Sequence, residues 1–340
     1  MKPTIALDAM GGDFAPANTV AGAILAAREL GSRVLLVGRE DEIARELEKH
    51  GARDSSLSIV HASETVAMDD PPAMALRRKK DSSLRVAANL VREGQAQALV
   101  SAGNSGAVMA TAMFVLGSVA GVDRPALAAV VPNRKGVTVW LDVGANVDSK
   151  PQHMRQWAIM AHIYAKNILG VSSPRVGLLS NGEEAGKGND VVKETFKLLQ
   201  ESRINFIGNV EGHDIFNGNA DVIVCDGFTG NVSLKAVESA TETLFHFLKQ
   251  EFSRSWRTRL GYVLSRPAFK GFRKRVDYAE FGGVPLLGVK GATIISHGKS
   301  SPRAIRNAIR VAGEVVANRV NDQIHKEIEE SSHGMRSETA

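Results

Sequence analysis

The stretch that decides the fold is TIALDAMGGD, residues 4–13. It begins with a short apolar run of strand length and ends in a turn with two glycines and an aspartate. An apolar run followed by a turn with glycine and polar residues recurs in ALVSAGNSG (98–106), VTVWLDVGAN (137–146) and VIVCDGFTGN (222–231). Ligands of open α/β sheets bind at the carboxyl ends of the strands. We therefore expect these turns to lie at the same end of one sheet and to carry the chemistry.

Helical patterns alternate with apolar runs along the chain. The candidate strands are Thr4–Leu7, Val34–Val37, Leu57–Val60, Ala98–Val100, Val137–Asp142, Arg175–Leu179, Asn205–Ile207, Val222–Cys225 and Thr293–Ser296. The candidate helices are Asn18–Glu29, Glu40–Lys49, Ser83–Arg92, Lys150–Ile168, Asn189–Glu201, Asn231–Gln250 and a last helix from Ser301 and Pro302 onward. This alternation predicts an α/β fold with a mainly parallel sheet and helices on both faces. We expect one catalytic unit over residues 1–331, with two lobes around a cleft, and a disordered tail over residues 332–340.

The composition is that of a globular protein, since 44% of the 340 residues are hydrophobic and 23% are charged. A single cysteine, Cys225, excludes an intramolecular disulfide and a zinc site built on cysteines. The sequence shows no secretory signal and no run of 18 uncharged apolar residues. These features favour a cytoplasmic protein.

Charge is unevenly distributed. The formal net charge is +5, but residues 252–276 hold eight Lys and Arg residues and no acid, so the rest of the chain is at −3. Such a patch indicates a local acidic partner rather than nucleic acid. Apolar residues at helical spacing predict an exposed amphipathic hairpin over residues 252–277, in which Pro267 separates two short helices. The alternative is that the apolar stripes pack into the body or across a dimer.

The turns that follow the strands are suited to anions, because glycine lets backbone N–H groups approach closely and Asn, Ser and Lys add donors. The turn SNGEEAGKG (180–188) is one residue short of a P-loop and has Gly where Ser or Thr would bind magnesium, which argues against an ATPase. No Gly-x-Gly-x-x-Gly follows a strand, which weakens a dinucleotide-binding interpretation. Lys187 is either a cation for phosphate or a solvated surface lysine.

Other polar residues have two interpretations each. Cys225 is a catalytic thiol or, more plausibly, a buried small hydrophobe. His297 is an acid or hydrogen-bond donor, or a structural residue. Four aspartates hold a metal or, as is commoner, cap turns and orient donors: Asp8, Asp13, Asp142 and Asp226.

Taken together, the turns resemble one family, the PlsX-type phosphate acyltransferases of bacterial phospholipid synthesis. The matching segments are 8–13, 101–106, 141–146, 180–184, 186–188, 225–231 and 278–283. The resemblance implies a three-layer α/β/α fold like that of the isocitrate and isopropylmalate dehydrogenases and the phosphotransacetylases. It further implies a cytoplasmic homodimer that associates peripherally with the membrane and contains no cofactor.

The activity implied by the resemblance is transfer of a fatty acyl group from acyl-[acyl-carrier protein] to inorganic phosphate. The acyl-phosphate would then pass to a membrane glycerol-3-phosphate acyltransferase. A thioester is already activated and phosphate is already anionic, so such an enzyme supplies positioning and an oxyanion hole. No metal, acyl-enzyme or nucleic-acid partner is expected.

Candidate residues follow from the turns and the hairpin. The candidate catalytic residues are Lys187, Asn104, Ser105, Asn231 and His297. The candidate substrate-binding residues are Asp8, Gly11, Gly12, Asp13, Gly103, Gly106, Asn146, Asn181, Gly182, Gly188, Gly227 and Gly230. The candidate contacts to carrier protein or membrane are Arg254, Trp256, Arg257, Leu260, Lys270, Arg273 and Lys274.

Two rival functions are compatible with the same residues. One is a metal-dependent decarboxylating dehydrogenase of the related fold, with a divalent cation on the aspartates. The other is a membrane-surface scaffold that acts through residues 252–276 without turnover.

Overall fold

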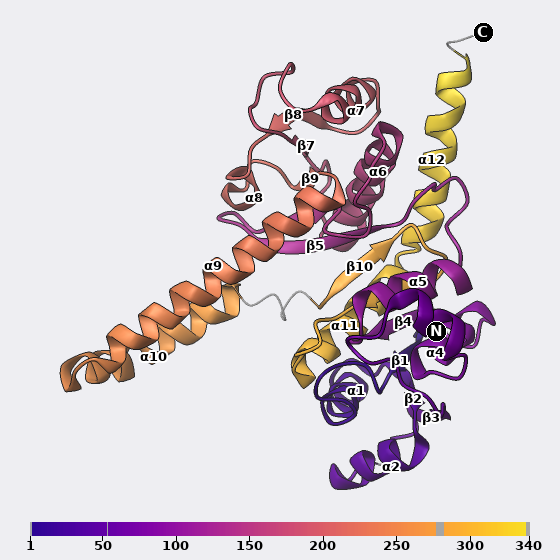
Figure 1. The fold of residues 1–340 in the computed structure, drawn as a ribbon, viewed down its shortest axis with the longest axis vertical. Helices are drawn as coiled ribbons and strands as arrows, with labels where there is room; N and C mark the ends of the chain where they lie inside the picture. The colour runs from indigo at the N-terminus through magenta and orange to yellow at the C-terminus, as the bar shows by residue number, and fades with distance from the viewer. Residues whose placement is uncertain (1, 53, 277–281, 338–340) are drawn as a thin grey trace.

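The computed structural model describes residues 2–52, 54–276 and 282–337, and these form a layered α/β body with a projecting helical hairpin (Figure 1). The strands are β1 (Thr4–Asp8), β2 (Arg33–Gly38), β3 (Leu57–His61), β4 (Ala98–Ser101), β5 (Ala126–Pro132), β6 (Val137–Leu141), β7 (Val176–Leu179), β8 (Phe206–Val210), β9 (Val222–Val224), β10 (Val284–Leu287) and β11 (Ala292–Ile295). The helices are α1 (Ala17–Leu30), α2 (Glu40–Lys49), α3 (Pro72–Arg78), α4 (Ser83–Arg92), α5 (Ser105–Val115), α6 (Pro151–Ile168), α7 (Asp190–Gln200), α8 (Asp214–Asn217), α9 (Gly227–Ser253), α10 (Trp256–Val276), α11 (Pro302–Ala317) and α12 (Val320–Ser337).

Helices cover both faces of the sheet, which confirms the three-layer α/β/α prediction. One core cluster unites the sheet with α1, α6, α11 and α12, and its largest buried side chains include Trp157 and Tyr164 of α6. A second cluster on the other face unites the sheet with α4, α5 and α8, and buries Trp140 of β6. Each face of the sheet therefore has its own apolar core, as buried strands in layered folds require.

The sheet has the strand order β3-β2-β1-β4-β11-β10-β5-β6-β9-β7-β8. The first five strands run parallel to one another, and so do the four strands from β6 to β8. Between these blocks, β10 is antiparallel to both β11 and β5, and β5 is antiparallel to β6. The two parallel blocks therefore run in opposite directions.

This topology corrects one expectation from the sequence. The turns after β1, β4 and β11 and the turns after β6, β7 and β9 do not lie at the same edge of the sheet, because the two blocks point in opposite directions. The apolar runs of β5 and β10 were not predicted to be strands. Their antiparallel pairing reverses the direction of the sheet at its centre.

Helix predictions were accurate where the amphipathic pattern is strong. The bounds of α2 and α4 agree with the predicted ones, α6 differs by one residue at its start, and α1 and α7 differ by one residue at each end. The predicted last helix divides at Arg319, which has a left-handed φ of 51°, into α11 and α12. The tail was expected to be disordered from residue 332, but α12 continues to Ser337, and residues 338–340 lie outside the described part.

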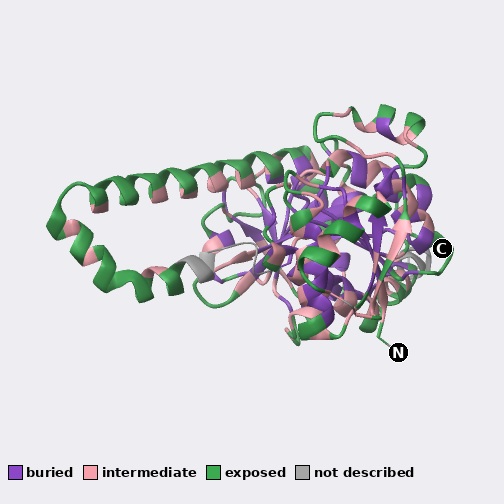
Figure 2. Ribbon diagram, turned by 90° about the horizontal axis from the view of Figure 1, so that it is seen from below, coloured by how far each residue is buried: buried purple, intermediate pink, exposed green. Residues whose placement is uncertain are grey.

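The hairpin is longer than predicted and turns at a different place. Its two helices are α9 and α10, and they project from the body with most of their described residues exposed (Figure 2). Pro267 lies inside α10 and does not separate two helices. The turn is at Arg254 and Ser255, where Ser255 Oγ accepts from Thr258 N (3.2 Å) and Thr258 Oγ1 accepts from Ser255 N (3.1 Å). This reciprocal cap begins α10 and ends the continuity with α9.

Candidate active site

The turns after β1 and β4 interlock around Asp8. Ser101 Oγ donates to Asp8 Oδ2 at 2.7 Å, and Gly103 N donates to Ser101 Oγ at 3.1 Å. A Cβ on Gly11 would lie 2.6 Å from Asp8 Oδ2 and 2.8 Å from Gly103 N, so only glycine fits there. Burial raises the pKa of the Asp8 carboxyl, against the hydrogen bonds it accepts. The buried carboxylate of Asp8 therefore links the turns after β1 and β4.

The turn after β11 and the segment 68–72 complete this first group. Asp13 N donates to Gly298 O at 2.8 Å. Asn104 Nδ2 donates to Met68 O (2.8 Å) and Asp70 O (3.0 Å), and its Oδ1 accepts from Ala107 N at the start of α5. Both the Nδ2 and the Oδ1 of Asn104, which the sequence predicted to be catalytic, are thus engaged in holding the loop.

Ser105, Gly106 and His297 lie around this loop. Ser105 is the exposed first residue of α5, where N–H groups and the helix dipole favour an anion. Gly106 faces the ring of Pro72, whose Cγ would be 2.7 Å from an added Cβ. His297 is exposed, and its Nδ1 accepts from Lys299 N at 3.1 Å.

A second group of turns is built around Asp142, which follows β6 and is fully buried. Its carboxylate accepts from the N–H groups of Leu127, Gly144, Ala145 and Asn146 and from Asn146 Nδ2, at 2.7–3.2 Å. Burial raises the pKa of this carboxyl as well. Asn146 Nδ2 also donates to Pro125 O at 2.8 Å, so this buried amide is part of the scaffold. The sequence had placed Asn146 among the substrate contacts.

The start of α9 presses against the Asp142 turn. Asp226 caps the helix, because its Oδ1 accepts from Thr229 N and its Oδ2 from Thr229 Oγ1 (2.8 and 2.7 Å). A Cβ on Gly230 would lie 1.9 Å from Asp142 O, and a Cβ on Gly227 would lie 2.4 Å from Asn146 O. Only glycine, which has no side chain, therefore lets the start of α9 lie this close to the backbone of the Asp142 turn.

Asn231 and Cys225 flank the same contact but differ in access. Asn231 is exposed and lies over Gly144, whose added Cβ would be 3.2 Å from Asn231 Cγ. Cys225 is buried; Trp140 Nε1 donates to its Sγ at 3.3 Å, and the Sγ lies 3.5 Å from Asp142 O. Burial raises the pKa of the thiol well above its usual range. Cys225 is therefore a packed thiol rather than a nucleophile.

The turn after β7 forms a third group. Gly188 N donates to Asn181 Oδ1 at 2.9 Å, and Lys187 N donates to Glu184 O at 2.9 Å. Lys187 is exposed, and the start of its side chain lies across Gly182, where an added Cβ would be 2.9 Å from Lys187 Cγ. Lys187 forms no ion pair within the described ranges. Its charge is therefore available to an anion.

The predicted site residues thus separate into three groups. Within the part of the chain that the structure describes, no hydrogen bond or ion pair joins the first group to the second or the third. Two parts of the candidate site were not predicted from the sequence. One is Ser101, whose hydroxyl donates to Asp8, and the other is the segment 68–72, whose carbonyl oxygens accept from Asn104. The run Asp69-Asp70-Pro71-Pro72 was a turn signal that could have indicated the second of these.

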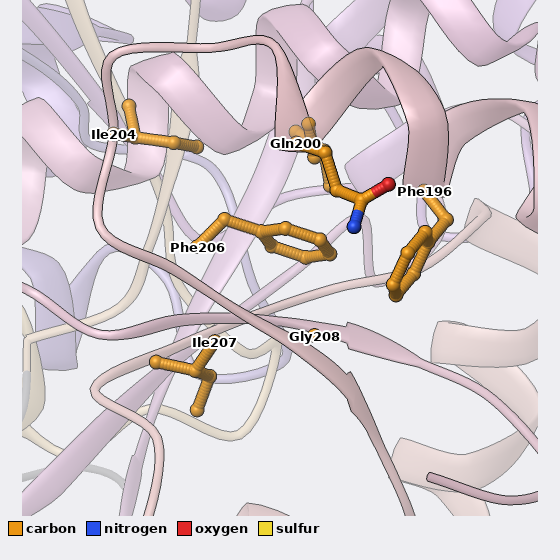
Figure 3. Close-up of a pocket in the computed structure, with 7 residues that line it drawn as sticks. Phe196, Gln200, Ile204, Phe206, Ile207 and Gly208 are labelled. Atoms are coloured by element: carbon orange, nitrogen blue, oxygen red, sulfur yellow. The ribbon is translucent and has the colours of Figure 1, made fainter. Parts of the chain in front are cut away.

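A cavity of about 410 Å³ lies away from these turns, between α7 and the edge strand β8 (Figure 3). Its lining is Phe196, Leu199, Gln200, Ile204, Phe206, Ile207 and Gly208. None of the predicted site residues contributes to it.

The fold is shared with solved phosphotransacetylases. The enzyme from Streptococcus pyogenes has a TM-score of 0.60 at 17% identity, over 93% of this chain and 94% of that one. EutD phosphotransacetylase from Staphylococcus aureus has a TM-score of 0.58 at 15% identity, over 92% and 94%. A 4-hydroxythreonine-4-phosphate dehydrogenase from Klebsiella pneumoniae has a TM-score of 0.52 at 14% identity, over 93% and 98%. The molecule thus has the fold of this group, which contains both acyl-transferring and dehydrogenase enzymes.

Sequence comparisons identify the family. A family model described as "Fatty acid synthesis protein" matches residues 3–323. The phosphate acyltransferase of Pelotomaculum thermopropionicum is 55% identical over 325 residues, which is 96% of this chain and 95% of that protein. The phosphate acyltransferase of Geobacter sulfurreducens is 52% identical over 325 residues, which is 96% and 94%. The chain belongs to this family of phosphate acyltransferases, which are transferases.

Proposed function

We propose that the protein transfers a fatty acyl group from acyl-[acyl-carrier protein] to inorganic phosphate and thereby supplies acyl-phosphate to phospholipid synthesis. A phosphate oxygen attacks the thioester carbonyl, the C–S bond breaks, and the carrier thiolate leaves and takes up a proton. The observation that carries the proposal is that exposed donors and a lysine surround the turns, whereas the one cysteine is buried. Membership of the phosphate acyltransferase family supports the same conclusion.

Exposure and hydrogen bonding distinguish the residues proposed to meet the substrates from those that hold the turns. The exposed polar side chains at these turns are those of Lys187, Asn181, Ser105, Asn231 and His297. Each of the three groups thus offers exposed polar side chains next to the N–H groups of glycine turns, which are the donors that neutralise phosphate and stabilise the oxyanion of an attacked carbonyl. Asp8, Asp142, Asn104 and Asn146 keep these turns in place through the bonds described above.

A decarboxylating dehydrogenase is the weaker candidate. It needs aspartates whose oxygens face a divalent cation. The carboxylates of Asp8, Asp142 and Asp226 instead accept hydrogen bonds from N–H and O–H donors of their own or neighbouring turns. The residues Glu183, His213 and Asp214 offer ligand atoms within 4.8 Å of one another, but both Asp214 oxygens already accept hydrogen bonds, from Glu211 N and Asn217 Nδ2.

The decisive experiment is an assay of phosphate-dependent release of free thiol from acyl-[acyl-carrier protein], with acyl-phosphate identified as the product. Lys187→Ala is expected to lower kcat/KM for phosphate at least tenfold, on the order of 1.4 kcal/mol, because it removes the exposed cation of the third group. Lys193→Ala, an exposed lysine on the next helix, is the matched control and should leave these kinetics unchanged. Absence of phosphate-dependent thiol release from the native protein would refute the proposed activity.

We propose that the enzyme is a homodimer and that the hairpin brings it to the membrane surface. Its turn presents Trp256 (70% exposed), Leu260 (52%) and Leu264 (74%) beside Arg254 and Arg257. Apolar side chains among basic ones suit the interface of an anionic bilayer. No helix in the described ranges is long and apolar enough to cross a bilayer.

Lys270 is exposed on α10, and the side chains of Arg273 and Lys274 lie outside the described residues. The test is sedimentation with anionic vesicles of the double variant Trp256→Ser, Leu264→Ser. It is expected to stay in the supernatant while the native protein sediments. Equal sedimentation of both proteins would remove the hairpin from this role.

A further inference from the structure

A second basic surface lies on the body, on α3 and the turn that follows it. The run Arg77-Arg78-Lys79-Lys80 ends this helix. Lys79 is tied to the fold, since its Nζ lies 2.5 Å from Asp70 Oδ2 and 2.8 Å from Thr65 O. Arg77, Arg78 and Lys80 are exposed and form no ion pair within the described ranges. Three unneutralised cations are thus held on a fixed helix end.

Exposed apolar side chains accompany these cations. Met74 precedes Arg77 and Arg78 by three and four residues and shares their helix face. Both α3 and α4 pack against α5, whose Phe114 is 69% exposed, and the Arg85 guanidinium lies over the Phe114 ring at 5.1 Å. Methionine and aromatic side chains with arginine are typical of protein-binding surfaces.

This surface adjoins the first group of turns. The segment 68–72 that leads into α3 receives both hydrogen bonds from Asn104 Nδ2, and Pro72 contacts the place of Gly106. Met68 Cε would lie 2.9 Å from an added Cβ on Gly298, in the turn after β11. A partner bound on α3 would therefore stand beside the loops that carry Ser105 and His297.

Charge indicates what the partner is. Residues 72–92 contain six basic residues and one acid, a net charge of +5, and residues 252–276 contribute +8. With a total of +5, everything outside these two segments is at −8. A nucleic acid would meet repulsion from that remainder, whereas a small acidic protein can dock on α3 alone. Asp69 is an exposed acid next to the surface, while Asp70 and Asp81 are engaged with Lys79 and Ser63.

The position of the hairpin also favours α3 as the docking place of the carrier protein. A helix of 27 residues such as α9 is about 40 Å long. Its far end projects away from the body (Figure 2). A carrier protein docked at the hairpin turn would hold its thioester far from the site turns, whereas one docked on α3 would hold it beside them.

We propose that the surface of Met74, Arg77, Arg78, Lys80, Arg85 and Phe114 docks the acidic acyl-carrier protein. This inference rests on the proposed function and assigns the carrier to the body, leaving the hairpin turn to the membrane.

The test uses the triple variant Arg77→Glu, Arg78→Glu, Lys80→Glu of the full chain. With acyl-[acyl-carrier protein] at low salt, kcat/KM is expected to fall at least tenfold. The phosphate KM, and the rate with a small acyl-pantetheine thioester that has no protein part, should change less than twofold. A milder variant, Arg77→Gln with Arg78→Gln, should fall between native and triple variant. Added salt should reduce the difference.

The matched control is Lys193→Glu with Lys197→Glu, two exposed lysines on α7, which should retain the carrier KM. A carrier KM that is unchanged in the triple variant, or an equal loss with the small thioester, would overturn the inference. Either result is distinct from failure of the proposed function, in which the native protein itself releases no thiol.

Discussion

The turn around Asp8 and the turn around Asp142 use the same device to different degrees. Each begins with a buried aspartate at the end of a strand, and each is pressed by a glycine that no larger residue can replace. Asp142 accepts five hydrogen bonds from N–H donors, all within its own and adjacent loops. Asp8 accepts from the hydroxyls of Ser101 and Ser83, which can rotate, and from the N–H groups of Met10 and Gly11. The Asp142 turn is therefore conformationally rigid, whereas the Asp8 turn can adjust its conformation around a substrate.

The largest expected effect is that of Gly230→Ala. The added Cβ would lie 1.9 Å from the backbone carbonyl oxygen of Asp142, a residue whose carboxylate accepts five hydrogen bonds, so the start of α9 must move. We expect a loss of about 3–5 kcal/mol in the free energy of unfolding, measured by urea denaturation. Gly11→Ala meets a side-chain carboxylate at 2.6 Å and should lose less. Gly186→Ala, with no atom within 4 Å, is the control, and equal losses in all three would contradict the comparison.

Next in size is the difference between Asp142→Asn and Asp8→Asn. At Asp142 the new NH₂ group faces N–H donors and leaves several of them buried without an acceptor, which costs about 3 kcal/mol or more. At Asp8 the Ser101 hydroxyl can reverse and accept, so about 1–2 kcal/mol is expected. Urea denaturation at neutral pH measures both losses. A larger loss for Asp8→Asn would reverse the assignment of rigid and adjustable turns.

How much the sequence predicted depends on the length scale of the feature. Local patterns gave the strands, the helices α2 and α4, and the turns that carry the polar residues. Strand direction was not predictable, because β5 and β10 look like any other apolar run and their pairing is set by distant chain. Hydrogen-bond occupancy was not predictable either. Asn104 and Asn146 resemble Asn181 and Asn231 in sequence, yet the first two give their amides to the scaffold.

The position of the hairpin turn was also not predictable from the sequence. The proline at position 267 is normally a helix breaker, but the long helix α10 accommodates it on an exposed element. The true turn was marked by a weaker signal, the Ser255 and Thr258 cap. Contacts between helices then fix the hairpin, since the Phe252 ring meets those of Tyr262 and Phe269 at 5.3 and 5.0 Å. Such pairings depend on where the chain turns, which residue types alone do not decide.

A smaller effect concerns pH. Burial raises the folded-state pKa of the Asp8 carboxyl above its ordinary value of 3.8, so the folded protein binds this proton more readily than the unfolded chain. The ionised carboxylate therefore reduces stability near neutral pH, and this cost is removed as the pH falls through the raised pKa. The stability of the native protein relative to Asp8→Asn should thus rise as the pH falls from neutrality toward the ordinary value of 3.8. A difference in unfolding free energy that stays constant over this range would show that Asp8 does not titrate there.

The smallest effect on activity is expected for Cys225→Ser, which lies against the rigid turn. Trp140 Nε1 donates to the sulfur and the thiol faces Asp142 O, two contacts that a serine hydroxyl can also make. Burial keeps the thiol protonated, and no exposed path leads an acyl thioester to a side chain that is 2% accessible. The variant should lose on the order of 1 kcal/mol of stability, from burial of a more polar group, and keep most of its phosphate-dependent activity. Incubation of the native protein with labelled acyl-[acyl-carrier protein] in the absence of phosphate should leave the chain unlabelled after denaturation. A stable acyl group on Cys225, or ping-pong kinetics, would instead require a covalent intermediate and an opening of the Asp142 turn large enough to expose the sulfur.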